Sequence, residues 1–402
     1  MGSDITAFKN AVPIIDYVDK YYRNVIPFTD RCSQYASAHC IWHEDINSPS
    51  LKFFAKTNTF KCFGCGKEGD LIDLVQHIEK VPFKEACMII SGNTGVPIHF
   101  EPVNPHHEAY KETMDEHTRR YWRNYQNSYQ ARQYMEEKRG FNKDTLDLYR
   151  IGLTDAQEYK IRNDIGNISN RITFPILEPK AYNAKCIGIA YRGLGNESPK
   201  YVNDMNQDGR QGQDQNLSGI FIKGNCLFGY AQAYSRIRDF NHIILVEGYT
   251  DVLSLYQSGI KNAVAIMGTQ LTEKQAQLIK NVTDNAILIM DGDTAGRLAA
   301  AKILKTLFRY GICSKIVLLD GTDPADLCLR HKFNGQAVFN VFKKTVTDSC
   351  EFIVSSLVAG YENTVSVERR KALSAAAEFM DIMDGNELML FKNSLYKRLD
   401  MR

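Results

Sequence analysis

The stretch LIMDGDTAGRLAAA, residues 288–301, decides how the second half of this chain is expected to fold. An apolar run that is typical of a buried strand ends at two acidic residues, Asp291 and Asp293, and a pattern typical of a helix follows directly. Two carboxylates this close together repel each other, and neither has an obvious cation beside it in the sequence. Their position indicates that they hold a positive charge from outside the chain.

The alternation of strand and helix extends over the whole region from His242 onward. Apolar segments at HIILVE, NAVAIM, NAILIMD and SKIVLLD are separated by helical patterns, and such alternation predicts βαβ units around a parallel sheet. The preceding residues 165–230 mix short strands with Gly and Asn turns. The tail, from about Thr345, is expected to be helical throughout.

Acidic side chains follow three of these predicted strands. The carboxyl ends of parallel strands gather at one edge of a sheet, so the acids can converge in one crevice. Clustered carboxylates without a basic partner are hard oxygen ligands that suit Mg²⁺. Solvated acids at strand ends are the alternative, which is common for one strand but not for three in succession. The acids are Glu247, Asp251, Asp291, Asp293, Asp320 and Asp323.

A second candidate metal site lies near the N-terminus. Cys40 and His43 are spaced C-x2-H, and Cys62 and Cys65 are spaced C-x2-C. A two-residue gap lets both side chains of a pair reach one ion, so the pairs predict a closed Cys3His zinc site of the structural type. Glycines stand where the tight turn of the second pair needs conformational freedom. They are Gly64 and Gly66, while Cys32 and His39 fall outside the spacing and are expected not to be ligands.

The segment between the two cysteine pairs alternates basic and aromatic residues. Lys52, Phe54 and Lys56 would share one face of a strand, and Lys61 and Phe63 could join them from the next strand. Such a face suits single-stranded DNA, with bases stacked on the rings and lysines near phosphates. It is equally compatible with a small core of phenylalanines and solvating lysines, and Trp42 is open to the same two interpretations.

Composition restricts these possibilities only weakly. The chain has 402 residues, 44% hydrophobic and 24% charged, with a net charge of +2, and no run of 18 apolar residues. Ten scattered cysteines without an N-terminal apolar segment favour free or metal-bound thiols in the cytoplasm. We expect a multi-domain α/β protein, with the boundaries set at a zinc-binding module in 1–91, a Gly- and Pro-rich linker in 92–109, a basic α+β part in 110–235, the parallel-sheet part in 236–345 and a helical tail in 346–402.

A strand ending in Glu-Gly, followed by a strand ending in Asp-x-Asp-x-x-Gly, is the Toprim pattern. With the segment AHCIWHEDINSPSLKFF…FKCFGCGKEGD, this chain resembles the bacterial DnaG-type DNA primases. RITFPI, YRGLGNESPKYVN, FIKGNCLFGY, LVEGYTDVL, AIMGTQLT and DGDTAGRLAAAK resemble segments of their polymerase core in the same order. The resemblance covers roughly residues 35–330. It implies a Rossmann-like Toprim sheet and an enzyme that makes short RNA primers on single-stranded DNA from ribonucleoside triphosphates.

The resemblance also implies roles for particular residues. Catalysis would depend on Glu247, Asp291 and Asp293 as ligands of Mg²⁺ or Mn²⁺, with Asp251 and Asp323 supporting them. Where the family usually has Asp-Pro-Asp, this chain has Asp323-Pro324-Ala325, which puts a second ligand there in doubt. The nucleic-acid-binding residues would be Arg139, Arg171, Arg192, Lys200 and Lys223 in the core, with Lys52 and Lys61 in the zinc module.

Further expectations concern partners and alternatives. We expect a monomer that acts on the DNA template and the RNA primer and does not associate with a membrane. The resemblance implies a compact form that lacks the helicase-binding domain and that would bind a replicative helicase, if any, in trans. The alternatives are a catalytically silent zinc and Toprim DNA-binding protein of the RecR type, or another Toprim enzyme such as a topoisomerase. The sequence lacks the G-x-x-x-x-G-K-[ST] loop of a helicase.

Overall fold

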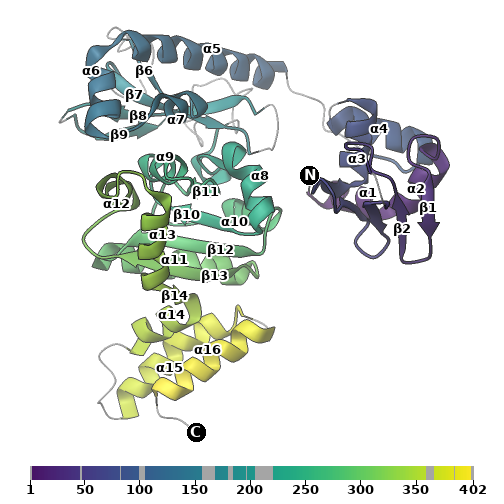
Figure 1. Cartoon of the computed structure of the whole chain (residues 1–402). Helices are drawn as coiled ribbons and strands as arrows, with labels where there is room; N and C mark the ends of the chain where they lie inside the picture. The colour runs from purple at the N-terminus through teal and green to yellow at the C-terminus, as the bar shows by residue number, and fades with distance from the viewer. Residues whose placement is uncertain are drawn as a thin grey trace. The chain divides into compact units, whose positions relative to one another are not determined.

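Hydrophobic residues before and after residue 102 form separate cores, and the chain accordingly divides into two units, residues 1–102 and 103–402. This computed structural model, drawn in Figure 1, describes residues 2–45, 48–81, 83–98, 105–155, 168–179, 184–195, 197–203, 221–358, 366–383 and 385–399. Within those ranges no helix is long and apolar enough to cross a membrane.

The first unit is an antiparallel sheet packed against helices. Its strands lie in sequence order, β1 (Phe28–Arg31), β2 (Tyr35–Ala38), β3 (Leu51–Phe54), β4 (Thr59–Cys62) and β5 (Glu68–Asp70). Every second side chain along β3 and β4 faces the core, so that Phe53 and Phe60 are fully buried cross-strand partners. The helices are α1 (Gly2–Ala11), α2 (Ile14–Tyr21), α3 (Leu71–Glu79) and α4 (Phe83–Thr94).

The second unit begins with a helical layer over a four-stranded antiparallel sheet of order β6-β7-β8-β9. The helix α5 (Pro105–Asn127) buries Tyr110, Met114, Tyr121 and Tyr125, which recur at helical spacing, and it contacts β6 and β8. Helices α4 and α5 both run into the stretch 92–109 that we expected to be a linker. The other elements are α6 (Tyr129–Arg132), the π-helix η1 (Gln133–Lys138), α7 (Lys143–Leu148), β6 (Gly152–Leu153), β7 (Arg171–Leu177), β8 (Cys186–Gly193) and β9 (Tyr201–Asn203).

The expected parallel sheet is confirmed, with strand order β11-β10-β12-β13-β14. Neighbouring strands from β11 to β13 pair in parallel, and their connecting helices complete the α/β architecture. The elements are η4 (Lys223–Asn225), α8 (Tyr230–Phe240), β10 (Ile243–Val246), α9 (Tyr249–Gln257), β11 (Ala263–Ala265), α10 (Glu273–Lys280), β12 (Asn285–Asp291), α11 (Thr294–Arg309), β13 (Cys313–Leu319), α12 (Pro324–Arg330), α13 (Gly335–Thr345) and β14 (Val346–Asp348).

The prediction of a tail that is helical throughout was wrong at its start. Val346–Asp348 forms β14, which pairs antiparallel with Lys315–Val317 and covers the edge of β13. The remaining tail is helical, in α14 (Ser349–Val358), α15 (Ser366–Met380) and α16 (Gly385–Arg398). Phe391 and Leu395 of α16 lie in the same hydrophobic core as Ile303 of α11, so the tail packs beneath the parallel sheet.

An aromatic cluster joins the antiparallel sheet to the parallel sheet. Tyr249, at the start of α9, stacks on Phe174 of β7 with ring centroids 5.2 Å apart and meets Phe228 edge-on at 5.0 Å. Its hydroxyl donates a hydrogen bond to Oδ1 of Asn203 at the end of β9, at 2.8 Å. The strands β7 and β9 are thereby fixed beside the end of β10, where Glu247 follows.

Candidate metal centres and nucleic-acid interface

The four expected zinc ligands lie together in the first unit. One donor atom from each of Cys40, His43, Cys62 and Cys65 lies within 4.8 Å of all the others. Cys40 Sγ and Cys65 Sγ are 3.8 Å apart, as are Cys62 Sγ and His43 Nδ1. Tetrahedral bonds of about 2.3 Å to zinc place two sulfurs about 3.8 Å apart, so the donor set fits one Zn²⁺ of the closed, structural type.

A carboxylate that the sequence interpretation missed orients this site. Asp45 lies 3.0 Å from Nε2 of His43, on the side of the ring away from the cluster. It also accepts hydrogen bonds from the backbone N–H of Cys40 at 2.8 Å and of Ser50 at 3.0 Å. A carboxylate on the second nitrogen of a ligand histidine fixes its tautomer and its direction. An acidic residue two positions after the C-x2-H pair was the available signal.

Hydrogen bonds prepare one thiol of the cluster for metal. Burial opposes ionisation of Cys62, but the backbone N–H of Cys65 and the hydroxyl of Ser50 approach its sulfur and lower its pKa to about 6. Gly64 is required beside this thiol, because a Cβ there would lie 2.3 Å from His43 Nε2. Gly66 has φ of +75°, as the tight turn requires.

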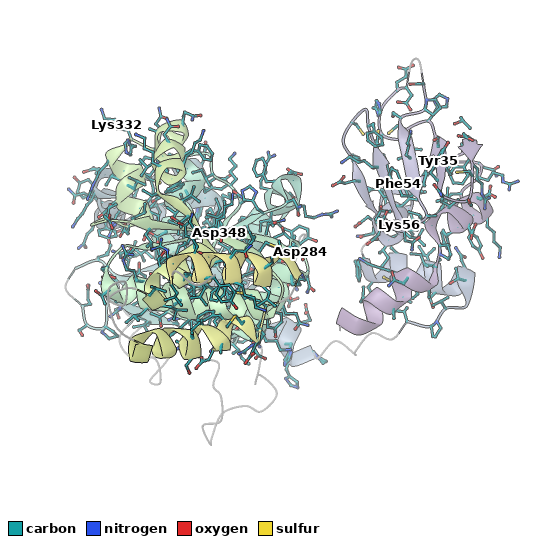
Figure 2. The ribbon with its side chains drawn as sticks, turned by 90° about the horizontal axis from the view of Figure 1, so that it is seen from below. Tyr35, Phe54, Lys56, Asp284, Lys332 and Asp348 are labelled. Carbon is teal, nitrogen blue, oxygen red and sulfur yellow. The ribbon has the colours of Figure 1, made fainter. Side chains whose placement is uncertain are left out.

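The outer face of the sheet carries the basic and aromatic residues noted in the sequence. Tyr35 and Phe54 are cross-strand partners, as are Lys52 and Lys61. Figure 2 shows Tyr35, Phe54 and Lys56 on this unit. Phe63 is 62% exposed and its ring lies 5.9 Å from the Lys52 ammonium, so it lies outside the core that Phe53 and Phe60 form. Lys61 pairs with Glu68 at 2.8 Å. Trp42 stacks on Phe60 at 5.3 Å, at the edge of the core.

In the second unit, the strand ends bring the acidic residues together. Glu247 follows β10, and Asp291 ends β12 one residue before Gly292 and Asp293. The pKa of Glu247 is raised by burial and by the nearby Asp291 and Asp293 carboxylates. The pKa of Asp291 is raised by burial, by Asp323 and by Asp293.

Two of the expected metal ligands also hold the protein together at this edge. Asp293 accepts a hydrogen bond from the Gly296 N–H at 2.7 Å and caps α11, and Asp323 caps α12 through Asp326 N–H at 2.7 Å. Each uses one oxygen in this way, and the structure shows no hydrogen bond from a described residue to the other oxygen. Asp320 is 90% exposed.

Asp251 occupies a different position from the other acids. It is buried, and its two oxygens accept hydrogen bonds from the backbone N–H of Gly248 at 3.0 Å and of Ala325 at 3.3 Å. Burial, together with Asp323, raises its pKa to about 7. With both oxygens engaged, Asp251 connects the turn after β10 to the start of α12, and so positions Glu247 relative to Asp323.

A cation that the sequence interpretation overlooked stands next to this acidic edge. Arg297, in the first turn of α11, donates from Nε to the Gly292 carbonyl at 3.0 Å, and its Nη2 lies 4.0 Å from Asp320 Oδ1. Its guanidinium is half exposed. Helical spacing brings it back to the strand end although it is four residues from Asp293 in sequence.

Two of the expected nucleic-acid-binding arginines pack around aromatic rings. Arg192 is buried, with its guanidinium carbon 5.6 Å from the Tyr134 ring centroid and 5.1 Å from that of Tyr201. Arg139 lies 5.8 Å from the same Tyr134 ring. Arg139 also approaches Asp326 within 4.0 Å, so the displaced acid of the Asp-Pro-Ala-Asp segment faces a cation.

The other basic residues fall into two groups. Arg171 is buried and donates to the carbonyls of Pro199 at 2.9 Å and Lys200 at 3.4 Å, which makes it a support for the β8–β9 connection. The side chains of Lys200 and Lys223 are exposed. The backbone around Lys223 is fixed by Gln275, whose Nε2 donates to the carbonyls of Lys223 and Cys226.

Comparisons with known proteins agree with this arrangement. Residues 2–105 match the CHC2 zinc finger family and residues 244–328 match the Toprim-like family. A DNA primase of Aquifex aeolicus is 27% identical over 87% of this chain and 73% of its own length. A DNA primase of Pasteurella multocida is 28% identical over 90% of this chain. The chain spans only 66% of the length of that relative.

Solved structures of primases share the fold. The zinc-binding and RNA polymerase domains of the Aquifex aeolicus primase cover 99% of this chain with a TM-score of 0.60 at 23% identity. The E. coli primase catalytic core covers 73% with a TM-score of 0.61 at 28% identity, and a DnaG primase catalytic domain bound to single-stranded DNA covers 73% with a TM-score of 0.60 at 27% identity. With a match to the CHC2 zinc finger followed by a match to the Toprim-like family on this fold, the chain is similar to the DnaG-type DNA primases.

Proposed function

We propose that this chain synthesises short RNA primers on single-stranded DNA by joining ribonucleoside triphosphates. The observation that carries the proposal is the convergence of Glu247, Asp291 and Asp293 at one edge of the parallel sheet, where Asp291 and Asp293 add to the effect of burial in raising the pKa of Glu247. The antiparallel sheet, which carries Arg171 and Arg192, is held beside this edge by Tyr249 and its aromatic neighbours. The similarity to a primase domain bound to single-stranded DNA supports DNA as the template.

Glu247, Asp291 and Asp293 would hold divalent cations, Mg²⁺ or Mn²⁺, with Asp323 contributing its free oxygen. When bound, such ions would supply charge neutralisation for an in-line displacement in which a 3′-hydroxyl attacks the α-phosphorus of the next triphosphate and pyrophosphate leaves. The protein would contribute positioning. Asp251 would hold the turn after β10 against the start of α12, and Arg297 would place a cation beside the acids. No covalent nucleophile is needed.

The basic residues would hold the nucleic acid. Lys200 and Lys223 are exposed and would contact phosphates of template or primer, while Arg139 and Arg192 would present a positive field around Tyr134. The face formed by Tyr35, Lys52, Phe54, Lys61 and Phe63 would bind unpaired template bases in the zinc module. We infer a monomer that meets a replicative helicase in trans.

The decisive experiment incubates the protein with single-stranded DNA, labelled ribonucleotides and Mg²⁺ and resolves the products on a gel. Wild-type protein should yield short oligoribonucleotides. Asp291→Ala, Asp293→Ala and Glu247→Gln should each abolish synthesis while leaving DNA binding largely intact, because the acids bind metal and the basic residues bind DNA. Full synthesis by Asp291→Ala would overturn the proposal, and Asp284→Ala, an exposed acid at the opposite end of β12, is the matched control.

A further inference from the structure

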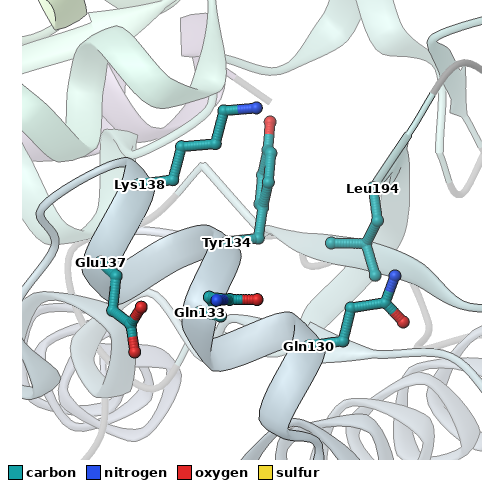
Figure 3. A pocket seen from close by; sticks show the side chains of 6 residues that line it. All are labelled: Gln130, Gln133, Tyr134, Glu137, Lys138 and Leu194. Atoms are coloured by element: carbon teal, nitrogen blue, oxygen red, sulfur yellow. The ribbon is translucent and has the colours of Figure 1, made fainter.

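A hollow of about 470 Å³ opens on the surface of the second unit, next to the Tyr134 ring. Figure 3 shows the Tyr134 ring standing between Lys138 and Leu194. The lining residues of α6 and η1 recur at intervals of three and four, which places them on one face of the helical segment. Besides Leu194, at the end of β8, they are Gln130, Gln133, Tyr134, Glu137 and Lys138.

The π-helical turn shapes this face. Segments with this wider turn are rare and are frequently found at functional sites. Here η1 carries Tyr134 to the buried guanidinium of Arg192, at 5.6 Å, and to Arg139, at 5.8 Å, while Lys138 lies 5.7 Å from the same ring. The Nε of Arg192 is buried without a hydrogen-bond partner among the described residues. Arg192 thus lies against the two tyrosine rings beside it. The hollow itself is lined by the charged side chains of Glu137 and Lys138 as well as by neutral groups.

The chemistry of the hollow is mixed in a particular way. Tyr134 and Leu194 are half-buried and supply an aromatic and an apolar surface, whereas Gln130, Gln133 and Glu137 are exposed around it. No hydrogen bond from these three polar side chains to another described residue is present. Two amides and a carboxylate can read the edge of a base, and an aromatic ring can stack on its face.

We propose that this hollow holds one unpaired nucleobase of the template strand. The inference rests on the proposed function and adds a subsite to it. A phosphate is disfavoured in the hollow because the Glu137 carboxylate would repel it. Lys138 and Arg139, at the end of η1, can bind the phosphates that flank this nucleotide. Since Glu137 can only accept hydrogen bonds when ionised, the hollow should prefer a base with an exocyclic amino group over thymine.

Equilibrium binding tests this directly. The zinc-loaded 402-residue chain is titrated into fluorescein-labelled dC16 or dT16 without added Mg²⁺ or Mn²⁺, and anisotropy gives the affinity at several salt concentrations. Gln133→Ala should weaken binding to dC16 about fivefold, and Tyr134→Leu on the order of tenfold. Both should leave the salt dependence unchanged, whereas Lys200→Ala should lower its slope by about 0.7. Gln277→Ala, an exposed glutamine on α10, is the matched control.

The outcome for each variant is unambiguous. Glu137→Gln should bring the affinities for dC16 and dT16 closer together, because the amide can donate to thymine. Wild-type affinity in both Gln133→Ala and Tyr134→Leu, or a loss accompanied by a lower salt slope, would refute the base subsite. Failure of primer synthesis by wild-type protein would instead refute the proposed function. The two failures can be told apart because the titration requires neither the catalytic Mg²⁺ or Mn²⁺ nor the synthesis reaction.

Discussion

At the residue scale, Asp251 shows how burial and charge act against each other near the acidic edge. Its carboxyl is enclosed by protein, and burial together with Asp323 raises its pKa from 3.8 to about 7. Two backbone N–H groups partly offset that effect by binding its oxygens. The folded state therefore holds a proton at Asp251 over a pH range in which an unfolded aspartate has lost it.

This proton makes stability depend on pH. Because the folded state binds more protons than the unfolded state between about pH 4 and 7, the metal-free protein should lose stability as pH rises through that window. Thermal unfolding at intervals of pH would show a falling midpoint. In the Asp251→Asn variant, whose side chain cannot titrate, the midpoint of unfolding should fall less over the same pH range, whatever the absolute stability of the variant. An identical slope in the variant would show that Asp251 is ionised throughout.

Asp45 leads to a prediction for the zinc module. Asp45→Ala removes the partner of His43 Nε2 and of two backbone N–H groups. Zinc affinity should fall about 10- to 100-fold, as for other carboxylates behind histidine ligands. Competition with a chromophoric chelator measures it. His39→Ala is the control, because His39 is exposed and 3.8 Å from the same carboxylate. Equal affinities in both variants would show that Asp45 only supports the loop.

The residues that sequence reasoning found and missed differ in a physical way. Cys40, His43, Cys62 and Cys65 could be found because short spacing alone brings such pairs to one ion. Asp291 and Asp293 could be found because a strand ends on them. Asp45, Arg297 and Tyr134 were missed because their roles depend on the direction of a side chain towards a partner. Those directions follow from the tertiary fold.

At the scale of elements, the junction of β12 and α11 depends on a close approach. A Cβ at Gly296 would lie 2.3 Å from the Asp291 carbonyl oxygen, so no side chain fits between the strand end and the helix. The strand and the helix here were predictable from the spacing of their hydrophobic residues, and the parallel sheet was predictable from the alternation of strands and helices. The strand β14 was not predictable, because three residues gain strand geometry only by pairing with the edge of β13.

Gly296→Ala should therefore displace the first turn of α11 and, with it, Asp293. We expect a loss of about 1–3 kcal/mol in the free energy of unfolding, together with loss of metal-dependent synthesis. Chemical denaturation and the primer assay measure the two effects. Gly92→Ala, in α4 with open space around its Cα, is the matched control and should be neutral or stabilising. Normal synthesis by Gly296→Ala would show that α11 tolerates the shift.

At the scale of the whole molecule, each unit has a hydrophobic core of its own. The hydrophobic core of the first unit draws all its residues from positions before 103, and the cores of the second unit draw theirs from positions after it. The first unit adds a zinc site, and metal binding to such small modules contributes directly to folding. The acidic edge, the antiparallel sheet with Arg171 and Arg192, and the hollow beside Tyr134 all belong to the second unit.

This separation predicts a division of labour between starting and extending a primer. A protein that begins at Pro105, where α5 begins, keeps the acidic edge and the antiparallel sheet that carries Arg171 and Arg192, but it loses the zinc site and the face around Phe63. Initiation must hold two free nucleotides and an unpaired template together, whereas extension starts from a preformed duplex, so initiation carries the larger entropic cost. The shortened protein, shown to be folded by circular dichroism, should extend a supplied RNA primer weakly and fail to start primers de novo. The control is the full-length Cys62→Ser, which should show the same defect if zinc holds the module in shape. De novo synthesis with unchanged choice of start site by the shortened protein would show that the module only stabilises the fold.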